Sequence, residues 1–468
     1  MTDHHDLAIL GGGPAGYVAA LRAAQLGMRV ALVEKQRVGG TCLNIGCIPT
    51  KALTTSTELL LKAKRAHEFG LAIAHVAPDL PALMDYKQRT VDALVGGVEH
   101  LLREAGVTVL GGEGRLVAPT TLQVQYGTGE ETTLPARQVI LAPGSVTARP
   151  PIPGLDLPGV ITSTEALDIA QVPARLVVVG GGVIGLEFAC IYEALGSQVT
   201  VLEMMPTLLP GGTDEALAKR LALLFRRRGL SIVTGAEVQG IESAGSGLAV
   251  TYRDAKGTVS QVEGDSVLVA TGRWPNTEGL GLAEAGVEMN GRAIAVNDYL
   301  ASSVPGVWAI GDAIGGMMLA HKAMVDGRVA AENASGVGRK VDYRSVPNVI
   351  FTRPEVASVG LTETQARSQG ADVKTAQFPF SANPRARILG ESDGLVKLVC
   401  EAGSGRVLGV HLMGPHVTDL IAEGALAVQM QATADDLAWT THAHPTLPEA
   451  MLEAALGFRN ATLHFHAR

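Results

Sequence analysis

Two cysteines placed five residues apart are the side chains of this sequence best suited to redox chemistry. Cys42 and Cys47 lie in residues 39–51, which read GGTCLNIGCIPTK. In an ideal α-helix the Cα atoms of such a pair are roughly 8–9 Å apart, beyond the limit of about 7 Å for a disulfide. A bridge therefore requires a distorted turn, which we expect Gly46 and Pro49 to provide.

Other uses of this pair have less support. A zinc site needs more ligands, and no Cys-x-x-Cys or Cys/His cluster is nearby. A plant-type iron–sulfur run needs a further Cys-x-x-Cys, but Ile48 and Pro49 follow Cys47. We predict a redox-active disulfide and no metal, with incidental thiols as the alternative. Cys190 and Cys400 lie in apolar runs, so we expect inert core residues there.

A histidine and glutamate near the C-terminus could supply the base that thiol chemistry needs. Residues 442–449 read HAHPTLPE. We predict His444 as the base and Glu449 as the carboxylate that orients the imidazole and stabilises its cation. The alternative for Glu449 is a capping box with Thr446, in which a first-turn proline is tolerated. For His442 we expect a packed structural role.

One dinucleotide-binding pattern occurs twice in the chain. Each copy joins a buried strand, a G-x-G-x-x-G turn, a helix, a second strand and an acid, and the acid lies 23 positions after the first glycine. The first copy has strands at 6–10 and 29–33, a helix to about 26, and Gly11, Gly13, Gly16 and Glu34; the second has strands at 176–179 and 198–202, a helix to about 195, and Gly180, Gly182, Gly185 and Glu203. Two such copies strongly indicate two nucleotide sites.

The physical role of each part of this pattern is known. The glycines let the backbone approach a pyrophosphate, and the helix N-terminus offers free N–H groups. The acid accepts hydrogen bonds from the ribose hydroxyls. Two glycine-rich turns without ligands are the alternative. Because the next arginine after Glu203 is Arg220, no guanidinium clamps a 2′-phosphate there. We therefore predict NAD rather than NADP at the second site.

Length and composition indicate a soluble globular protein of several domains. A chain of 468 residues exceeds one hydrophobic core, and 47% apolar with 18% charged residues is typical of globular proteins. The net charge is −8 and no Lys/Arg block occurs, which argues against binding to nucleic acid or to an anionic membrane. No apolar stretch of 18 residues or secretory signal is visible, and four cysteines make no disulfide scaffold, so we expect a cytoplasmic protein.

The remaining segments complete the predicted fold class, which is α/β with two Rossmann-like dinucleotide-binding domains and a C-terminal α+β domain. Strands at 266–272 and 307–312 are expected to return the chain to the nucleotide-binding region. The C-terminal domain is expected to contain strands at 396–400 and 407–412, a helix at 419–431 and a closing helix from Leu447. We expect this last domain to form an oligomer interface.

Together these motifs resemble the pyridine nucleotide–disulfide oxidoreductase family, and within it the class that oxidises dihydrolipoamide. The resemblance spans residues 9 to 449. The matching segments are residues 39–51, 180–187, ATGRWPNT at 270–277, 309–312 with MLAHKA at 318–323, PEVASVGLTE at 354–363 and 442–449. It implies FAD and NAD as cofactors and a lipoyl-carrier domain of a 2-oxo acid dehydrogenase complex or glycine-cleavage protein as partner. It implies domains at 1–145 (FAD, first part), 146–270 (NAD), 271–342 (completing the FAD region) and 343–468 (dimerisation).

The resemblance also implies roles for individual residues. FAD is expected at Gly11, Gly13, Gly16, Glu34, Thr41, Lys51, Gly114, Asp312 and Ala320, and NAD at Gly180, Gly182, Gly185, Glu203 and Gly272. Lys51 resembles a lysine beside the flavin whose carboxylate partner matches Glu187, although a solvated helix residue is the alternative. His444 and Glu449 of one subunit are expected to act on the disulfide and flavin of the other, so a homodimer is required for activity.

The implied mechanism starts with His444 taking a proton from a lipoyl thiol, which attacks Cys42 and leaves the Cys47 thiolate to pass electrons to FAD. Two departures from the family are Pro143, where threonine is usual beside Ser145, and Pro448, where serine is usual. The rivals are another disulfide reductase of the family, which Glu203 and the absence of cysteines after Cys400 oppose, and a non-catalytic subunit docking on a multienzyme complex.

Overall fold

A computed structural model of the chain describes residues 5–245 and 247–465, which form two compact units. Among the described residues, the first unit combines 5–149, 162–171 and 272–342, and the second combines 150–161, 172–245, 247–271 and 343–465. Within the described residues no helix has the length and apolarity needed to cross a membrane.

The first unit is built on a sheet with the strand order β3-β2-β1-β6-β5-β4, with β19 beside β6. Strands β2 and β6 flank β1 in parallel, whereas β5 turns back antiparallel along the long β6. Its elements are β1 (His5–Leu10), α1 (Pro14–Gln25), β2 (Val30–Glu34), α2 (Gly40–Ile45), α3 (Cys47–Lys64), η1 (Ala66–Phe69), α4 (Leu80–Glu104), β3 (Thr108–Gly111), β4 (Glu113–Ala118), β5 (Thr121–Gln125), β6 (Glu131–Leu141), β7 (Ser145–Thr147), η2 (Glu165–Leu167), β16 (Arg273–Pro275), β17 (Met289–Asn290), β18 (Ala293–Ile294), β19 (Val307–Ala309), η3 (Gly311–Ile314) and α7 (Ala320–Ala334).

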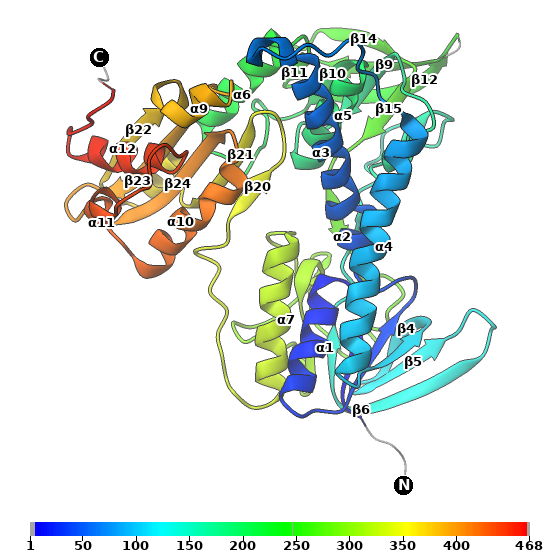
Figure 1. The fold of residues 1–468 in the computed structure, drawn as a ribbon. Helices are drawn as coiled ribbons and strands as arrows, with labels where there is room; N and C mark the ends of the chain where they lie inside the picture. Colours follow the sequence, from blue (N-terminus) through cyan, green and yellow to red (C-terminus); the bar gives the residue numbers. More distant parts are fainter. Residues whose placement is uncertain (1–4, 246, 466–468) are drawn as a thin grey trace. The chain divides into compact units, whose positions relative to one another are not determined.

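Helices α1 and α7 lie side by side and cover this sheet (Figure 1). Leu7, Ile9 and Leu32 from the strands join Ala19 and Val329 from the two helices in one buried cluster. The alternate residues Ala8, Leu10 and Val33 are buried in a second cluster on the other face. Burial on both faces explains why the strand sequences are continuously apolar, as is usual in parallel sheets.

The turn from β1 to α1 requires glycine. Gly11 has a φ of 102°, and a Cβ added there would lie 2.2 Å from the carbonyl oxygen of Ala142. A Cβ on Gly16 would lie 1.8 Å from the carbonyl oxygen of Gly11. The glycine spacing therefore lets helix α1 start immediately beyond the sheet, with its N-terminus at the carboxyl end of β1.

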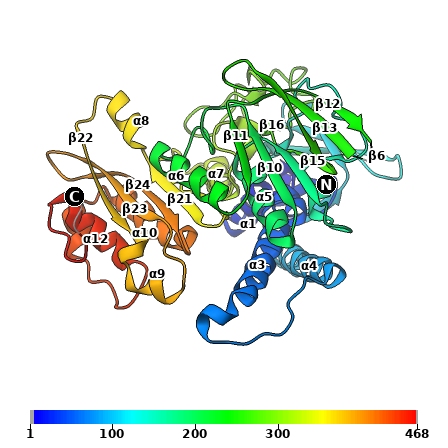
Figure 2. The ribbon, with the colours of Figure 1, turned by 90° about the horizontal axis from the view of Figure 1, so that it is seen from above.

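The second unit contains a parallel sheet with the order β11-β10-β9-β15-β8 and an antiparallel sheet with the order β20-β21-β24-β23-β22. Helices α10 and α12 pack against the antiparallel sheet (Figure 2). The elements are β8 (Val160–Ile161), β9 (Arg175–Val179), α5 (Val183–Leu195), β10 (Gln198–Glu203), α6 (Glu215–Arg227), β11 (Ser231–Thr234), β12 (Glu237–Ala244), β13 (Gly247–Arg253), β14 (Val259–Gly264), β15 (Ser266–Val269), β20 (Asn348–Ile350), β21 (Glu355–Gly360), α8 (Glu363–Ser368), β22 (Val373–Pro379), η4 (Phe380–Ala382), α9 (Pro384–Ile388), β23 (Leu395–Glu401), β24 (Val407–Gly414), α10 (Val417–Met430), α11 (Ala434–Trp439) and α12 (Glu449–Phe458).

The predicted α/β class, with a C-terminal α+β part, is confirmed, and the strands and helices predicted around both glycine motifs occur within one or two residues. Two predicted strands are shorter than expected. The strand predicted at 266–272 ends at Val269, and the one at 307–312 ends at Ala309. Gly272 and Gly311, with φ values of 119° and 70°, turn the backbone beyond these points.

Candidate active site

Cys42 and Cys47 lie on two consecutive helices separated by a single glycine. Helix α2 ends at Ile45, Gly46 breaks the helix with φ −145° and ψ −111°, and α3 starts at Cys47. A Cβ on Gly46 would lie 2.8 Å from the carbonyl oxygen of Thr41, so the break is tight. This confirms that a distorted turn separates the cysteines.

The position of Pro49 agrees with the predicted share in this distortion, because in one continuous helix its ring would clash with the carbonyl of Ile45, where α2 ends. Pro49 lies in the first turn of α3, where a backbone N–H has no intrahelical partner and proline costs little. Gly46 and Pro49 are thus both placed where the helix breaks.

The two sulfur atoms are close enough to share a proton. Both cysteines are free thiols in this structure, and the hydrogen bond with Cys47 raises the pKa of Cys42, with burial adding to the effect. The charge of Lys51 acts in the opposite direction on the same thiol. The two thiols therefore titrate as a coupled pair, in which the hydrogen bond with Cys47 favours the protonated form of Cys42.

His444 and Glu449 form the predicted pair in the second unit. The Nδ1 atom of His444 lies 2.8 Å from Oε1 of Glu449, and the imidazole is 70% exposed. Burial raises the pKa of Glu449, but hydrogen bonds from the Thr446 N–H and from His444 outweigh it and lower this pKa below its ordinary value. The carboxylate is therefore ionised at neutral pH, and it leaves Nε2 of His444 available for proton transfer.

The capping box considered for Thr446 does not form. Helix α12 starts at Glu449 after Pro448, and the Thr446 hydroxyl donates to the carbonyl oxygen of Ala443. Oε2 of Glu449 does accept the Thr446 N–H at 2.7 Å. One carboxylate thus fixes the turn and orients His444 at once, and Pro448 is accommodated directly before the helix.

His442 has the structural environment expected for it. Its side chain is 5% exposed, with Nε2 2.9 Å from Oε1 of Glu423 and Nδ1 2.8 Å from the carbonyl oxygen of Thr440. The hydrogen bond to Glu423 raises the pKa of His442, against the effect of burial. Both ring nitrogens are engaged, so His442 holds the segment that leads to His444.

The first glycine motif has the geometry that a flavin dinucleotide needs. Oε2 of Glu34 accepts the Gly12 N–H at 2.7 Å, which holds the turn against β2. A Cβ on Gly13 would meet only Cα of Gly40, at 3.9 Å, so the turn is open where a pyrophosphate would approach. At Gly114 a Cβ would meet Leu10 at 2.4 Å, because β4 packs closely there.

The other residues expected to bind FAD come from separate elements of the same unit. Thr41 lies on α2, Asp312 in η3, and Ala320 is the first residue of α7. The fold of the first unit therefore places these groups around one sheet, and their roles toward FAD remain predictions.

A hydrogen-bonded cluster beside this region was missed in the sequence. The Ser145 hydroxyl donates to Oδ2 of Asp312 at 2.5 Å and accepts from Nε of Arg273 at 2.8 Å. Arg273 also donates to the carbonyl oxygen of Ser145 at 2.7 Å. Ser145 thus keeps a defined position despite Pro143, whose carbonyl oxygen accepts from the Asn276 amide at 3.2 Å. Only the position of Arg273 inside ATGRWPNT hinted at this role.

The second glycine motif repeats the first in the other unit. Oε2 of Glu203 accepts the Gly181 N–H at 2.6 Å, and a Cβ on Gly182 would meet nothing within 4 Å. Gly185 packs against the carbonyl oxygen of Gly180. Gly272 belongs to the first unit, where its carbonyl oxygen accepts the Ala148 N–H at 3.0 Å.

Lys51 and Glu187 are each placed within their own unit. Lys51 lies on α3 of the first unit, and Glu187 lies buried on α5 of the second, where Oε1 accepts the Phe351 N–H at 3.0 Å. Their expected pairing remains a prediction. Cys190 and Cys400 are buried as expected, and burial raises the pKa of Cys400 to about 12.

Comparison with known proteins covers nearly the whole chain. Residues 5–327 match the family described as pyridine nucleotide-disulphide oxidoreductase, and residues 346–455 match the dimerisation domain of that family. The dihydrolipoyl dehydrogenase of Thermus scotoductus is 45% identical over 98% of both chains, and that of Bacillus subtilis is 41% identical over 99% of this chain and 100% of the relative.

Relatives with other names are similar as well. The leghemoglobin reductase of Glycine max is 41% identical over 97% of this chain and 88% of its own. Among solved structures, LpdA from Mycobacterium tuberculosis has a TM-score of 0.89 at 31% identity, covering 96% of this chain and 98% of its own. The HOCl-induced flavoprotein disulfide reductase RclA of Escherichia coli has a TM-score of 0.85 at 30% identity, covering 96% and 99%.

Proposed function

Because the chain belongs to the pyridine nucleotide-disulphide oxidoreductase family, we propose that it oxidises protein-bound dihydrolipoamide to lipoamide and reduces NAD⁺ to NADH. It is an oxidoreductase that uses FAD and NAD. The observation that carries the proposal is the thiol pair, Cys42 and Cys47, held across a single glycine break in a chain so similar to dihydrolipoyl dehydrogenases.

His444 acts first in the proposed reaction. Its Nε2 takes the proton from one thiol of dihydrolipoamide, while Glu449 stabilises the resulting imidazolium through Nδ1. The lipoyl thiolate attacks the sulfur of Cys42 in the oxidised pair, forming a mixed disulfide and releasing Cys47 as a thiolate. The second lipoyl thiol then attacks the lipoyl sulfur of the mixed disulfide, which closes lipoamide and releases the Cys42 sulfur. The proton of this second thiol passes to Cys42, while His444 keeps the first proton.

The hydrogen bond between Cys42 and Cys47 supports the proposed direction of electron flow. The hydrogen bond with Cys47 favours the protonated form of Cys42, and we infer that Cys47 is the sulfur that passes the electron pair to FAD. FAD, when bound, supplies the two-electron acceptor, and NAD⁺ takes the final hydride. The open face of Gly13 and the Glu34 carboxylate would hold FAD, and Gly182 with Glu203 would hold NAD.

The active site is proposed to be shared between two subunits. A match to the dimerisation domain of the family supports a homodimer. In this dimer His444 and Glu449 of one subunit would act on Cys42 and Cys47 of the other, and the exposure of the His444 ring leaves it free to do so. The lipoyl group is proposed to arrive on a carrier domain of a 2-oxo acid dehydrogenase complex or glycine-cleavage protein.

The cytoplasm is the proposed compartment. Four cysteines in a chain of this length, two of them a redox pair and two buried, suit an environment in which thiols stay reduced.

Anaerobic titration with dihydrolipoamide tests this function. We expect the oxidised enzyme to develop a long-wavelength thiolate–flavin charge-transfer band, and to reduce NAD⁺ with dihydrolipoamide much faster than NADH reduces glutathione disulfide or hypochlorite-derived oxidants. The Cys47→Ser variant should lose both the band and the turnover. Efficient reduction of another disulfide, with no dihydrolipoamide turnover, would instead make the chain a different reductase of this family, as the likeness to RclA suggests.

A further inference from the structure

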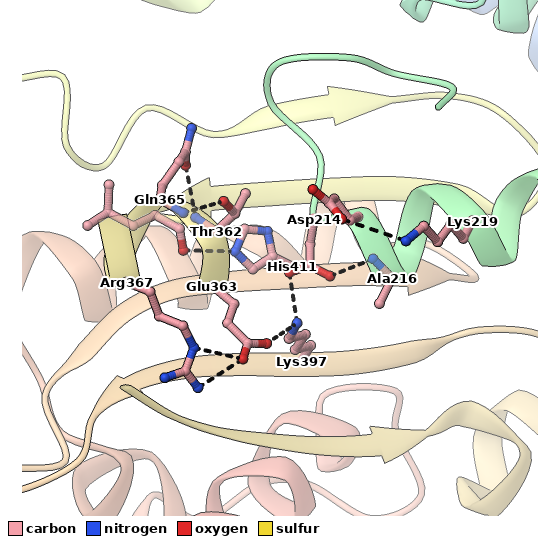
Figure 3. Close-up of polar contacts among 11 residues, drawn as sticks. Asp214, Ala216, Lys219, Thr362, Glu363, Gln365, Arg367, Lys397 and His411 are labelled. Atoms are coloured by element: carbon pink, nitrogen blue, oxygen red, sulfur yellow. Dashed lines mark hydrogen bonds and ion pairs between the residues drawn. The ribbon is translucent and has the colours of Figure 1, made fainter. Parts of the chain in front are cut away.

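A lysine buried in the C-terminal sheet has no part in the thiol chemistry. Lys397 lies on β23 with 4% of its side chain exposed. Its Nζ lies 2.8 Å from Oδ2 of Asp214 and 2.9 Å from Oε2 of Glu363 (Figure 3). Burying an ammonium group is costly unless charged partners surround it, so this arrangement is specifically built.

Asp214 connects the lysine to the nucleotide-binding part of the unit. It is the N-cap of helix α6, and its Oδ1 accepts the Ala216 N–H at 3.1 Å. One carboxylate oxygen therefore holds the helix start and the other holds Lys397. The segment 204–213 ends at this point.

The other end of segment 204–213 is bonded to the second glycine motif. Oε1 of Glu203 accepts the Met205 N–H at 2.7 Å, and the Leu209 N–H donates to the carbonyl oxygen of Gly181 at 2.9 Å. Met204 is 66% exposed directly after the acid, and Leu208 is buried against Gly181. The segment thus borders the place where the ribose of a dinucleotide binds in this type of fold.

The surroundings of Lys397 are balanced in charge. Glu363 also pairs with Arg367 at 3.0 Å, so two cations face two carboxylates. His411 pairs with Lys397 across β23 and β24, and its Nε2 lies 3.0 Å from the carbonyl oxygen of Leu361. Burial lowers the pKa of His411, which keeps the ring neutral beside the lysine.

Helix α8 carries Glu363 in a fixed position. The Thr362 side chain accepts the Gln365 N–H, and the Gln365 side chain accepts the Thr362 N–H, completing a capping box. Lys397 is therefore held from the sheet side and from α8, and Asp214 is the group it can restrain.

We propose that Lys397 is a positioning residue for NAD, which fixes segment 204–213 through Asp214 so that the segment fits the adenosine half of the dinucleotide. This inference rests on the use of NAD by the family and not on the identity of the disulfide substrate. A purely structural ion pair would affect stability without affecting nucleotide binding, and this difference makes the two explanations separable.

The test compares Lys397→Met with the wild-type homodimer loaded with FAD. Methionine keeps most of the apolar stem but removes the charge. The KM for NAD⁺ and the dissociation constant for NADH should each rise roughly 3- to 30-fold, while kcat at saturating NAD⁺ stays within about twofold. Reduction of the bound flavin by dihydrolipoamide in the absence of NAD⁺ should be unchanged.

Two further variants make the result decisive. Asp214→Asn retains the Ala216 N–H bond but removes the ion pair, so it should reproduce the loss in NADH affinity, and it serves if Lys397→Met does not fold. Arg367→Met removes the second cation on Glu363 without touching Asp214, and its NADH affinity should equal that of the wild type. Unchanged NADH affinity in folded Lys397→Met or Asp214→Asn would overturn the proposal, as would an equal loss in Arg367→Met. Because NADH titration needs no thiol substrate, failure of dihydrolipoamide oxidation would leave this result intact.

Discussion

The Glu449→Gln substitution tests whether the carboxylate charge supports His444. In the wild-type chain Oε1 lies 2.8 Å from Nδ1 of His444 and Oε2 lies 2.7 Å from the Thr446 nitrogen. Both neighbours donate hydrogen bonds. A glutamine has the same shape but only one acceptor oxygen, so one of the two donors faces an NH₂ group and the imidazolium loses its counter-charge.

The structure sets the expected size of the effect. A hydrogen bond to a charged group is worth about 1.5–3 kcal/mol, which corresponds to roughly 10- to 150-fold in rate. Because the His444 imidazole is 70% exposed, solvent screening reduces this effect, and we expect the lower part of the range. We expect kcat for NAD⁺ reduction by dihydrolipoamide to fall by about this factor, less than the 10²- to 10⁴-fold loss expected for His444→Ala. The KM for NAD⁺ should be unaffected.

A matched control lies one turn further along helix α12. Oε1 of Glu453 lies 2.7 Å from Nδ1 of His464, so Glu453→Gln makes the same chemical change beside a histidine with no assigned role. Its kcat should remain within about twofold of the wild-type value. If Glu449→Gln retained full kcat, or if Glu453→Gln lost as much, the assignment of Glu449 as partner of the base would be refuted.

Three other predictions concern the cofactors and the pH dependence of stability. The wild-type kcat/KM should favour NAD⁺ over NADP⁺ by at least about tenfold, because a 2′-phosphate would lie beside Glu203; a preference for NADP⁺ would contradict this. Gly11→Ala should purify with little bound flavin, measured by absorbance per subunit, since its Cβ would lie 2.2 Å from the Ala142 oxygen, and normal flavin content would show that the turn adapts. Because the pKa of His442 is raised, its bond to Glu423 stabilises the folded protein fully below the ordinary pKa of 6.5 and loses that effect as the pH rises through the folded pKa. The deficit of Glu423→Gln in the free energy of unfolding, measured with urea, should therefore shrink between about pH 6 and pH 9. A deficit that stays constant would argue against this linkage.

The sequence predicted the parts of the site that depend on local spacing. The glycine turns, the break at Gly46 and the contact between His444 and Glu449 all involve residues close in the chain, and each follows from local geometry. The cluster of Ser145, Arg273 and Asp312 could not be predicted in this way, because it joins residues 128 and 167 positions apart. No periodicity or motif spacing records such a contact.

The C-terminal sheet shows the same limit more clearly. Lys397 lies in a run that reads LVKLVCE, where alternation alone would place a lysine on a solvated face. Its burial depends on Asp214, 183 positions earlier in the chain. A buried charge is predictable only when its partner is known, and that information lies in the tertiary fold.

The two acids of the glycine motifs do more than the ribose contact first assigned to them. Glu34 accepts the N–H groups of Gly12 at 2.7 Å and Gln36 at 2.9 Å, and Glu203 accepts those of Gly181 and Met205 at 2.6 and 2.7 Å. Each carboxylate therefore holds its glycine turn to the following segment, and only its remaining lone pairs are available to a ribose. Replacing Glu203 with alanine would loosen the turn and remove the ribose acceptor together. Nucleotide preference is for this reason better read from the wild-type enzyme, in which both hydrogen bonds of Glu203 are in place.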